Sequence, residues 1–116
     1  MSSPTQRTLK LLRDEGYLVQ VVERWCSFTK RRHDLFGIID VLAIKEGETL
    51  AVQTTSGSGV SARIKKMLDS DTLQPILKAG WKVHVHGWRK VKLKRGGKAM
   101  RWAVRIVDMD DKLDVS

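Results

Sequence analysis

The sequence has little cysteine, no long apolar run and a shortage of acidic residues, and each of these excludes a class of protein. Its single cysteine, Cys26, excludes an internal disulfide and a zinc site built from Cys-x-x-Cys pairs. No apolar stretch approaches the roughly 20 residues of a transmembrane helix, so we expect no membrane partner. The first ten residues, MSSPTQRTLK, lack the apolar core of a secretory signal, and we therefore expect a cytoplasmic protein.

Acidic residues are outnumbered, with 13 Asp and Glu against 22 Lys and Arg and a net charge of +9. Residues 108–116, DMDDKLDVS, contain four Asp and one Lys, a charge of −3, so residues 1–107 carry +12. A basic body of this size predicts a polyanionic partner, most often nucleic acid. A merely solubilising surface, a ribosome-associated or RNA-binding protein and a membrane-surface protein are the alternatives. The acidic segment 108–116 is interpreted as a flexible tail.

The length of 116 residues suits one compact domain, which we assign to residues 1–107. Apolar periodicity, β-branched runs and glycine or proline boundaries predict an α/β domain with a mixed sheet. Residues 26–37 are interpreted as a polar, basic loop. The predicted elements are a helix over 4–15, strands over 17–25, 38–45 and 49–55, helices over 60–68 and 71–79, and strands over 81–88 and 99–108.

Two of these strands carry polar residues where core residues are expected. Asp40 lies among aliphatic residues in IIDVL, and Gln53 and Thr55 follow Leu-Ala-Val on one face of the next strand. The short turn EGE joins the strands as an antiparallel hairpin, so these polar groups can converge. A buried carboxylate needs a metal ion, a cation or several donors. An oxygen-rich cleft on a basic protein suits a Mg²⁺-dependent phosphodiesterase, and a salt bridge from Asp40 to Arg101 or Arg105 is the alternative.

The motif GIID at 37–40, with Gln53 of AVQTT thirteen residues after Asp40, resembles the PD-(D/E)XK nuclease superfamily. The small members of this superfamily include Holliday-junction-resolvase-like and VRR-type nucleases of microbes and phages. The resemblance covers residues 5–87 and implies a restriction-endonuclease-like domain, with an αβββαβ core whose central mixed sheet is flanked by helices. It further implies a Mg²⁺- or Mn²⁺-dependent DNA endonuclease that acts on branched or phage DNA. Because resolvase-type relatives often pair, a homodimer is an open alternative.

The site implied by this resemblance departs from the family pattern. The first family carboxylate corresponds to Asp40, but the second acidic position corresponds to Gln53 and the family lysine to Thr55. Asp34, six residues before Asp40, is the obvious replacement carboxylate. The candidate catalytic residues are therefore Asp40, Gln53, Thr55 and Asp34. Asp40, Asp34 and Gln53 would hold the metal, with Thr55 touching the water that the metal holds.

Other positions of the implied site are also altered. The glutamate of the first family helix corresponds approximately to Gln6, and His33 is a candidate base or phosphate contact. One of Arg63, Lys65 and Lys66, in the next helix, is expected to stand in for the missing lysine. A DNA-binding module that kept the fold and lost hydrolysis is therefore the alternative function, favoured by the neutral residues in the site.

A second basic segment follows in RKVKLKRGGK, where six of ten residues are basic around a Gly-Gly turn within a hairpin at 88–99. This density, beside several tryptophans, favours contact with phosphates over a solvated loop. Alternation in WKVHVHGW places His84 and His86 on one face, and we expect a solvent-facing or DNA-facing pair rather than a zinc site. The predicted nucleic-acid-binding residues are Arg63, Lys65, Lys66, Arg89, Lys90, Lys92, Lys94, Arg95 and Lys98.

Overall fold

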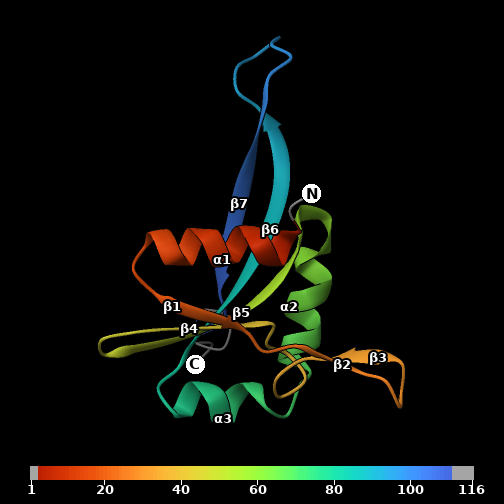
Figure 1. Cartoon of the computed structure of the whole chain (residues 1–116), viewed down its shortest axis with the longest axis vertical. Helices are drawn as coiled ribbons and strands as arrows, with labels where there is room; N and C mark the ends of the chain where they lie inside the picture. The colour runs from red at the N-terminus through yellow and green to blue at the C-terminus, as the bar shows by residue number, and fades with distance from the viewer. Residues whose placement is uncertain (1–2, 111–116) are drawn as a thin grey trace.

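A five-stranded mixed sheet forms the centre of the computed structural model, which describes residues 3–110. The spatial order of its strands is β1-β4-β5-β6-β7, and every neighbouring pair is antiparallel except β5 and β6, which are parallel. The predicted α/β class with a mixed sheet is therefore confirmed (Figure 1). The strands are β1 (Leu18–Val21), β4 (Val41–Lys45), β5 (Glu48–Ser56), β6 (Lys82–Lys92) and β7 (Met100–Asp108).

The first helix, α1 (Pro4–Asp14), covers one face of the sheet. Ser3 caps it by accepting a hydrogen bond on Oγ from the Gln6 N–H at 3.2 Å, and Pro4 occupies a first-turn position where its missing N–H costs nothing. Leu9 and Leu12 of this helix pack against buried residues of the sheet, namely Val41, Ala43, Leu50 and Val52. α1 thus buries an apolar stripe, as its sequence periodicity predicts.

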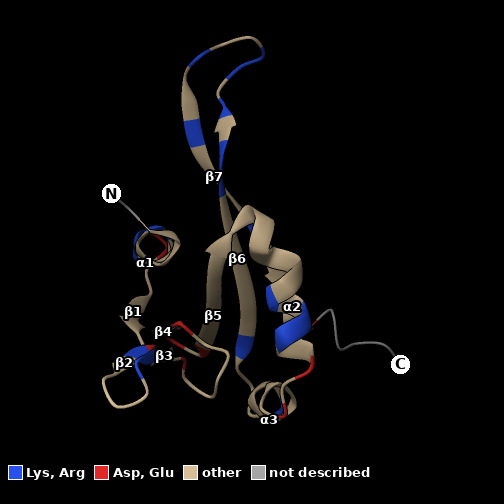
Figure 2. Ribbon diagram, turned by 90° about the vertical axis from the view of Figure 1, so that its right-hand side faces the viewer, with Lys and Arg blue, Asp and Glu red and all other residues tan. Residues whose placement is uncertain are grey.

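The opposite face of the sheet is covered by the connection between the two parallel strands (Figure 2). This connection consists of a 3₁₀ turn, η1 (Gly57–Gly59), and the helices α2 (Val60–Leu68) and α3 (Leu73–Lys78). Parallel neighbours require such a crossover, because a tight turn can join only antiparallel strands. Its buried residues Val60, Met67, Leu73 and Ile76 pack against Ala51, Val83 and Val85 of the sheet. The result is three layers, with the sheet between α1 and the α2–α3 pair.

Glycine allows the crossover to lie close to the sheet at one point. Gly87 of β6 is buried, and a Cβ atom at this position would collide with Cγ2 of Val60 at the start of α2. The absence of a side chain at Gly87 therefore sets how closely α2 approaches β6.

The segment between β1 and β4 differs from the prediction. Instead of one strand over 17–25 and a loop over 26–37, the chain leaves the sheet after β1 and forms a separate hairpin of β2 (Arg24–Cys26) and β3 (Arg31–His33). The predicted strand over 38–45 begins only at Val41, because residues 36–38 form a turn in which Phe36 and Gly37 have positive φ angles of 54° and 79°. Asp40 therefore lies one residue before β4 rather than within it.

The last two strands extend beyond the rest of the sheet. β5 ends at Ser56, which pairs with Trp88, so the β6–β7 pairs from Arg89↔Ala103 to Lys92↔Met100 form a two-stranded arm. The arm projects away from the body, and its turn is closed by a hydrogen bond from the Leu93 N–H to the Ala99 carbonyl at 3.0 Å (Figure 1).

In the acidic segment at the C-terminal end, Asp108 ends β7 and Met109 is fully buried, while residues 111–116 lie outside the described part of the chain. Among residues 3–110, no helix has both the length and the apolar character needed to cross a bilayer.

Candidate metal centre

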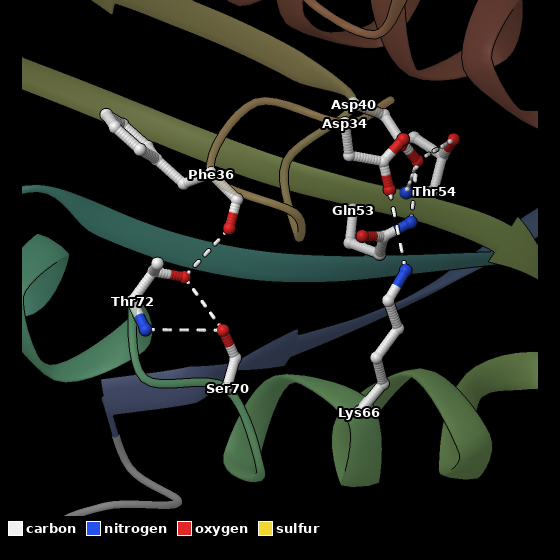
Figure 3. A network of polar contacts seen from close by, with 8 residues as sticks. All are labelled: Asp34, Phe36, Asp40, Gln53, Thr54, Lys66, Ser70 and Thr72. Atoms are coloured by element: carbon white, nitrogen blue, oxygen red, sulfur yellow. Dashed lines mark hydrogen bonds and ion pairs between the residues drawn. The ribbon is translucent and has the colours of Figure 1, made fainter. Parts of the chain in front are cut away.

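Backbone hydrogen bonds to two neighbouring segments fix the position of Asp40, directly before β4. Its backbone N–H donates to the Val52 carbonyl at 2.9 Å, and its carbonyl accepts from the Val22 N–H at 2.8 Å. Its side chain, only 4% exposed, accepts hydrogen bonds on Oδ2 from Gln53 Nε2 and the Thr54 N–H, both at 2.9 Å, and from Thr54 Oγ1 at 3.2 Å (Figure 3). Asp40 is thus a buried carboxyl group whose orientation is set by donors from β5.

The protonation of Asp40 is strongly perturbed. Burial raises its pKa to about 7, because removal from water disfavours the charged form. The hydrogen bond from the Thr54 N–H acts in the opposite direction, whereas a hydrogen bond with Asp34 and the negative charges of Asp34 and Glu23 raise the pKa further. Near neutral pH this carboxyl group is therefore only partly ionised, and a nearby cation would shift it to the charged form.

Three carboxylates converge at this position. One oxygen each from Glu23, Asp34 and Asp40 lies within 4.8 Å of the others. Glu23 directly precedes β2, Asp34 directly follows β3, and Asp40 directly precedes β4. The predicted pair of Asp34 and Asp40 is therefore brought together, and Glu23 is an additional acidic residue that the sequence analysis missed. The sequence indicates Glu23 only weakly, as an acidic residue that follows Val21 and Val22 within the predicted strand.

Gln53 adds a polar atom without a partner to the same site. Its side chain is 1% exposed, its Nε2 donates to Asp40, and its Oε1 is buried without a hydrogen-bond partner. A rotation of the amide by 180° would exchange the two atoms and place Oε1 beside Asp40 Oδ2. Two oxygens at the present 2.9 Å separation match neighbouring ligands of a cation coordinated at about 2.1 Å. The donor set, three carboxylates and an amide oxygen, is what hard divalent cations prefer.

These residues line a cleft of about 780 Å³ between the start of α1, the strands and α2. Arg63 and Lys66 line the cleft from α2. Lys66 Nζ lies 3.6 Å from Asp34 Oδ2 (Figure 3). Of the three candidates for the missing lysine, the structure thus places Arg63 and Lys66 in the cleft, whereas Lys65 is exposed and outside its lining. The lining residues are Ser3, Pro4, Thr5, Gln6, Val21, Glu23, Asp34, Asp40, Gln53, Thr54, Thr55, Ser56, Arg63 and Lys66.

Of the other predicted site residues, Thr55 and Gln6 lie in the cleft and His33 does not. Thr55 lines the cleft beside the turn that precedes α2, where a Cβ atom on Gly59 would collide with Thr55 Oγ1. Gln6 also lines the cleft. His33, the candidate base, is exposed on the β2–β3 hairpin, where its Nε2 lies 3.0 Å from Thr29 Oγ1, and it is not part of the cleft lining.

The second predicted basic segment lies apart from the cleft. Figure 2 shows lysine and arginine residues along the β6–β7 arm, which projects away from α2. Arg89, at the base of the arm, lies beside Gly57 of η1. All six of the predicted phosphate-binding residues of this segment are exposed: Arg89, Lys90, Lys92, Lys94, Arg95 and Lys98. Of the nine predicted nucleic-acid-binding residues, two therefore lie in the cleft and six lie on the arm, while Lys65 belongs to neither group.

The expectation that His86 faces solvent or DNA is wrong. His86 is 1% exposed because α1 covers this face of β6, and its Nδ1 lies 3.2 Å from Thr8 Oγ1. Thr8 Oγ1 also accepts a hydrogen bond from Trp88 Nε1 at 2.9 Å, so its own proton is available for His86. Burial lowers the pKa of His86 to about 4, and this residue is neutral at physiological pH. Its neighbour His84 is half-buried, with Nε2 3.8 Å from Asp108 Oδ2.

The whole arrangement combines an acidic centre with a cationic rim. Three carboxylates and an amide can hold a divalent cation, while Lys66 and Arg63 can hold an anion beside it. A phosphate diester is an anion of this kind, and its hydrolysis is accelerated where a metal ion and fixed cations stabilise the charge of the transition state. A comparison with models of known protein families gives no match, and a comparison with curated proteins gives none either.

Proposed function

We propose that this protein is a divalent-metal-dependent DNA endonuclease of the PD-(D/E)XK type. The observation that carries the proposal is the convergence of Glu23, Asp34 and Asp40 within 4.8 Å in a cleft that also receives Lys66. The order of a helix, an antiparallel meander of β1, β4 and β5, a helical crossover and the parallel strand β6 also supports it. Apart from the inserted β2–β3 hairpin, this order agrees with the αβββαβ core that the sequence resemblance implies.

Asp40, Asp34 and Glu23 would hold the metal ion, with Gln53 as a neutral fourth ligand after rotation of its amide. A bound Mg²⁺ or Mn²⁺ supplies Lewis-acid polarisation of a phosphate oxygen and charge stabilisation. Burial raises the pKa of Asp40 to about 7, so the ionised fraction of this carboxyl group increases as the pH rises through 7. Because the metal binds the ionised form, metal affinity should increase over the same pH range.

Lys66 would supply from α2 the positive charge that the family lysine supplies from the strand corresponding to β5. Its Nζ reaches the carboxylates from α2, at 3.6 Å from Asp34, and can hold a non-bridging phosphate oxygen. Thr55 can orient a water molecule through its hydroxyl group but brings no charge. Arg63, one helical turn before Lys66, extends the cationic rim along the path of the DNA backbone.

The test is a cleavage assay on supercoiled, single-stranded and four-way-junction DNA with Mg²⁺ or Mn²⁺. We expect Asp40→Ala to abolish cleavage while DNA binding in EDTA persists. Lys66→Ala should lower the cleavage rate about 100- to 1,000-fold, the usual effect of removing a group that stabilises transition-state charge. Lys65→Ala, on the same helix but outside the cleft, is the matched control and should stay within a few fold of the native rate.

A DNA-binding module without hydrolysis is the second candidate function. It is favoured by the three hydrogen bonds that Asp40 Oδ2 accepts from Gln53 and Thr54, because they give this buried oxygen partners within the protein itself. Salt-sensitive DNA binding without cleavage, equal in the native protein and in Asp40→Ala, would support this module and reject the endonuclease.

A further inference from the structure

The β2–β3 hairpin carries the most exposed aromatic side chains of the described residues. Phe28, in its turn, is 95% exposed, and Trp25, on β2, is 61% exposed. The hairpin forms a sheet of its own, separate from the central sheet. Because neither ring is buried against the body, both are available to a partner.

The charge around these rings identifies the class of partner. Residues 24–33, RWCSFTKRRH, contain four arginine or lysine residues, no acidic residue and no aliphatic residue. Arg24, Lys30 and Arg31 are all exposed. Aromatic rings interleaved with cations are what a protein needs to bind unpaired nucleotides, because the rings stack on bases while the cations contact phosphates. A second copy of the chain is a poor partner, because a two-fold contact would bring the same cations face to face.

The position of the hairpin links it to the cleft. Glu23 lies immediately before β2, and Asp34 lies immediately after β3, so both ends of the hairpin are carboxylates of the candidate metal centre. At about 3.3 Å per residue, the five residues from Glu23 to Phe28 span at most about 16 Å. With a rise of about 3.4 Å per base pair, this distance corresponds to about five base pairs of duplex DNA.

We infer that the β2–β3 hairpin is an aromatic wedge that stacks on unpaired bases and directs the cleft to junctions between double- and single-stranded DNA. This inference rests on the proposed nuclease function only for the position of cleavage. The preference in binding depends on the exposed rings and cations of the hairpin alone. Phe28 supplies the ring at the tip, Trp25 the ring on the strand, and Arg24, Lys30 and Arg31 the contacts with phosphates.

Binding is measured first, in EDTA, where no hydrolysis is required. Fluorescence anisotropy compares a forked duplex that has single-stranded tails with a fully paired duplex of the same composition. We expect the native protein to prefer the fork, and Phe28→Ala to weaken binding to the fork about 5- to 150-fold while leaving the paired duplex within twofold. Phe28→Trp should restore the preference. Leu18→Ala removes another exposed apolar side chain, 71% exposed on β1, and is the matched control that should change neither affinity.

A chemical probe locates the contact. Cys26 is the only cysteine of the chain and lies on β2, so the rate at which it reacts with a thiol reagent reports on access to the hairpin. The fork should slow this reaction more than the paired duplex does. Equal slowing by both DNAs, or an equal loss of affinity for both in Phe28→Ala, would overturn the inference. The inference would also be overturned if the native protein were a dimer and the Phe28→Ala variant a monomer, since the hairpin would then bind a second copy of the chain.

Cleavage mapping in Mg²⁺ separates this inference from the proposed function. Cuts within about five base pairs of the fork, shifted or scattered in Phe28→Ala, would support both. A preference for the fork in EDTA without any cleavage in Mg²⁺ would reject the nuclease and leave the wedge intact. Cleavage without a preference for the fork would reject the wedge and leave the nuclease intact.

Discussion

Replacing Asp40 by asparagine should stabilise the metal-free protein, because the native carboxyl group carries a charge penalty in its buried position. Its pKa rises from 3.8 to about 7 on folding, which is about three pKa units or about 4 kcal/mol at 1.36 kcal/mol per unit. Because the folded pKa is the higher one, this cost is absent below pH 4, grows between pH 4 and pH 7 and is complete above pH 7. Asparagine is neutral and avoids it.

The hydrogen bond from the Thr54 N–H is already included in this shift, because it lowers the pKa that burial raises. The figure is therefore the net cost of the charge in the folded protein. We expect Asp40→Asn to be about 3–4 kcal/mol more stable than the native protein at pH 8 in EDTA. At roughly 4 °C per kcal/mol for a chain of this size, the melting temperature should rise by about 12–16 °C. At pH 4 the gain should vanish.

The assay is urea denaturation at pH 4 and pH 8, each in EDTA and in excess Mg²⁺. Mg²⁺ at 100 times its Kd stabilises a protein that binds it by about 2.7 kcal/mol, so the metal should raise the stability of the native chain and not that of Asp40→Asn. Circular dichroism checks that the variant keeps its fold. An Asp40→Asn protein that is less stable than the native chain at pH 8 in EDTA would refute the reasoning, because the carboxylate would then stabilise the fold.

Three further predictions concern other parts of the fold. His86, whose pKa falls to about 4 on burial, stabilises the folded state above pH 6.5 and loses this contribution as the pH falls toward 4. Because the cost of the Asp40 charge disappears over the same range, the quantity to measure is the difference in free energy of unfolding between the native protein and His86→Gln, which should fall by up to about 3 kcal/mol from pH 6.5 to pH 4. The same difference at both pH values would contradict this. Gly87→Ala should lower the free energy of unfolding by about 1–3 kcal/mol, measured in urea, because its Cβ meets Val60; a neutral effect would show that α2 can shift. On the arm, Lys92, Lys94 and Arg95 are replaced together by alanine. This triple variant should bind DNA of every sequence equally more weakly, and the slope of log affinity against log salt should fall by about 0.9 for each phosphate that is no longer bound. An unchanged slope would exclude the arm from the interface.

The sequence alone was sufficient where one local rule decides the outcome. The glycine in the turn EGE and the apolar runs on each side of it predicted the β4–β5 hairpin, and the cost of burying a carboxylate identified Asp40 as a residue in need of partners. Asp34 was chosen as the replacement for the family carboxylate whose position is occupied by Gln53, and it lies beside Asp40.

Glu23 was missed because its position depends on contacts distant in sequence. Residues 17–25 have the composition of one continuous strand, but the Val22 N–H donates to the Asp40 carbonyl and the chain then leaves the sheet. The hairpin that follows has no glycine in its turn; Lys30 takes the positive φ angle of 53° instead. No local pattern therefore indicates that Glu23 and Asp34 flank a hairpin and meet at its base.

His86 shows a limit of alternation as a signal. Alternation correctly separates the two faces of β6, but it does not say which of them is covered. In the centre of this sheet both faces are covered, one by α2 and the other by α1, and Thr8 and Trp88 give His86 a polar environment within the core. Only the packing of α1 distinguishes a buried histidine from an exposed one.

The single parallel pair in the sheet has a consequence for the order of folding. Residues 4–56 and residues 82–108 each contain strands whose antiparallel partners are close in sequence, so each part can begin to form locally. The pairing of β5 with β6 must wait until the intervening helices have closed a much longer loop. Since Asp40 comes from the first part and Lys66 from the connection, we expect the ability to bind a cation and a phosphate together to arise late, and its appearance during refolding would report the final docking of the two halves.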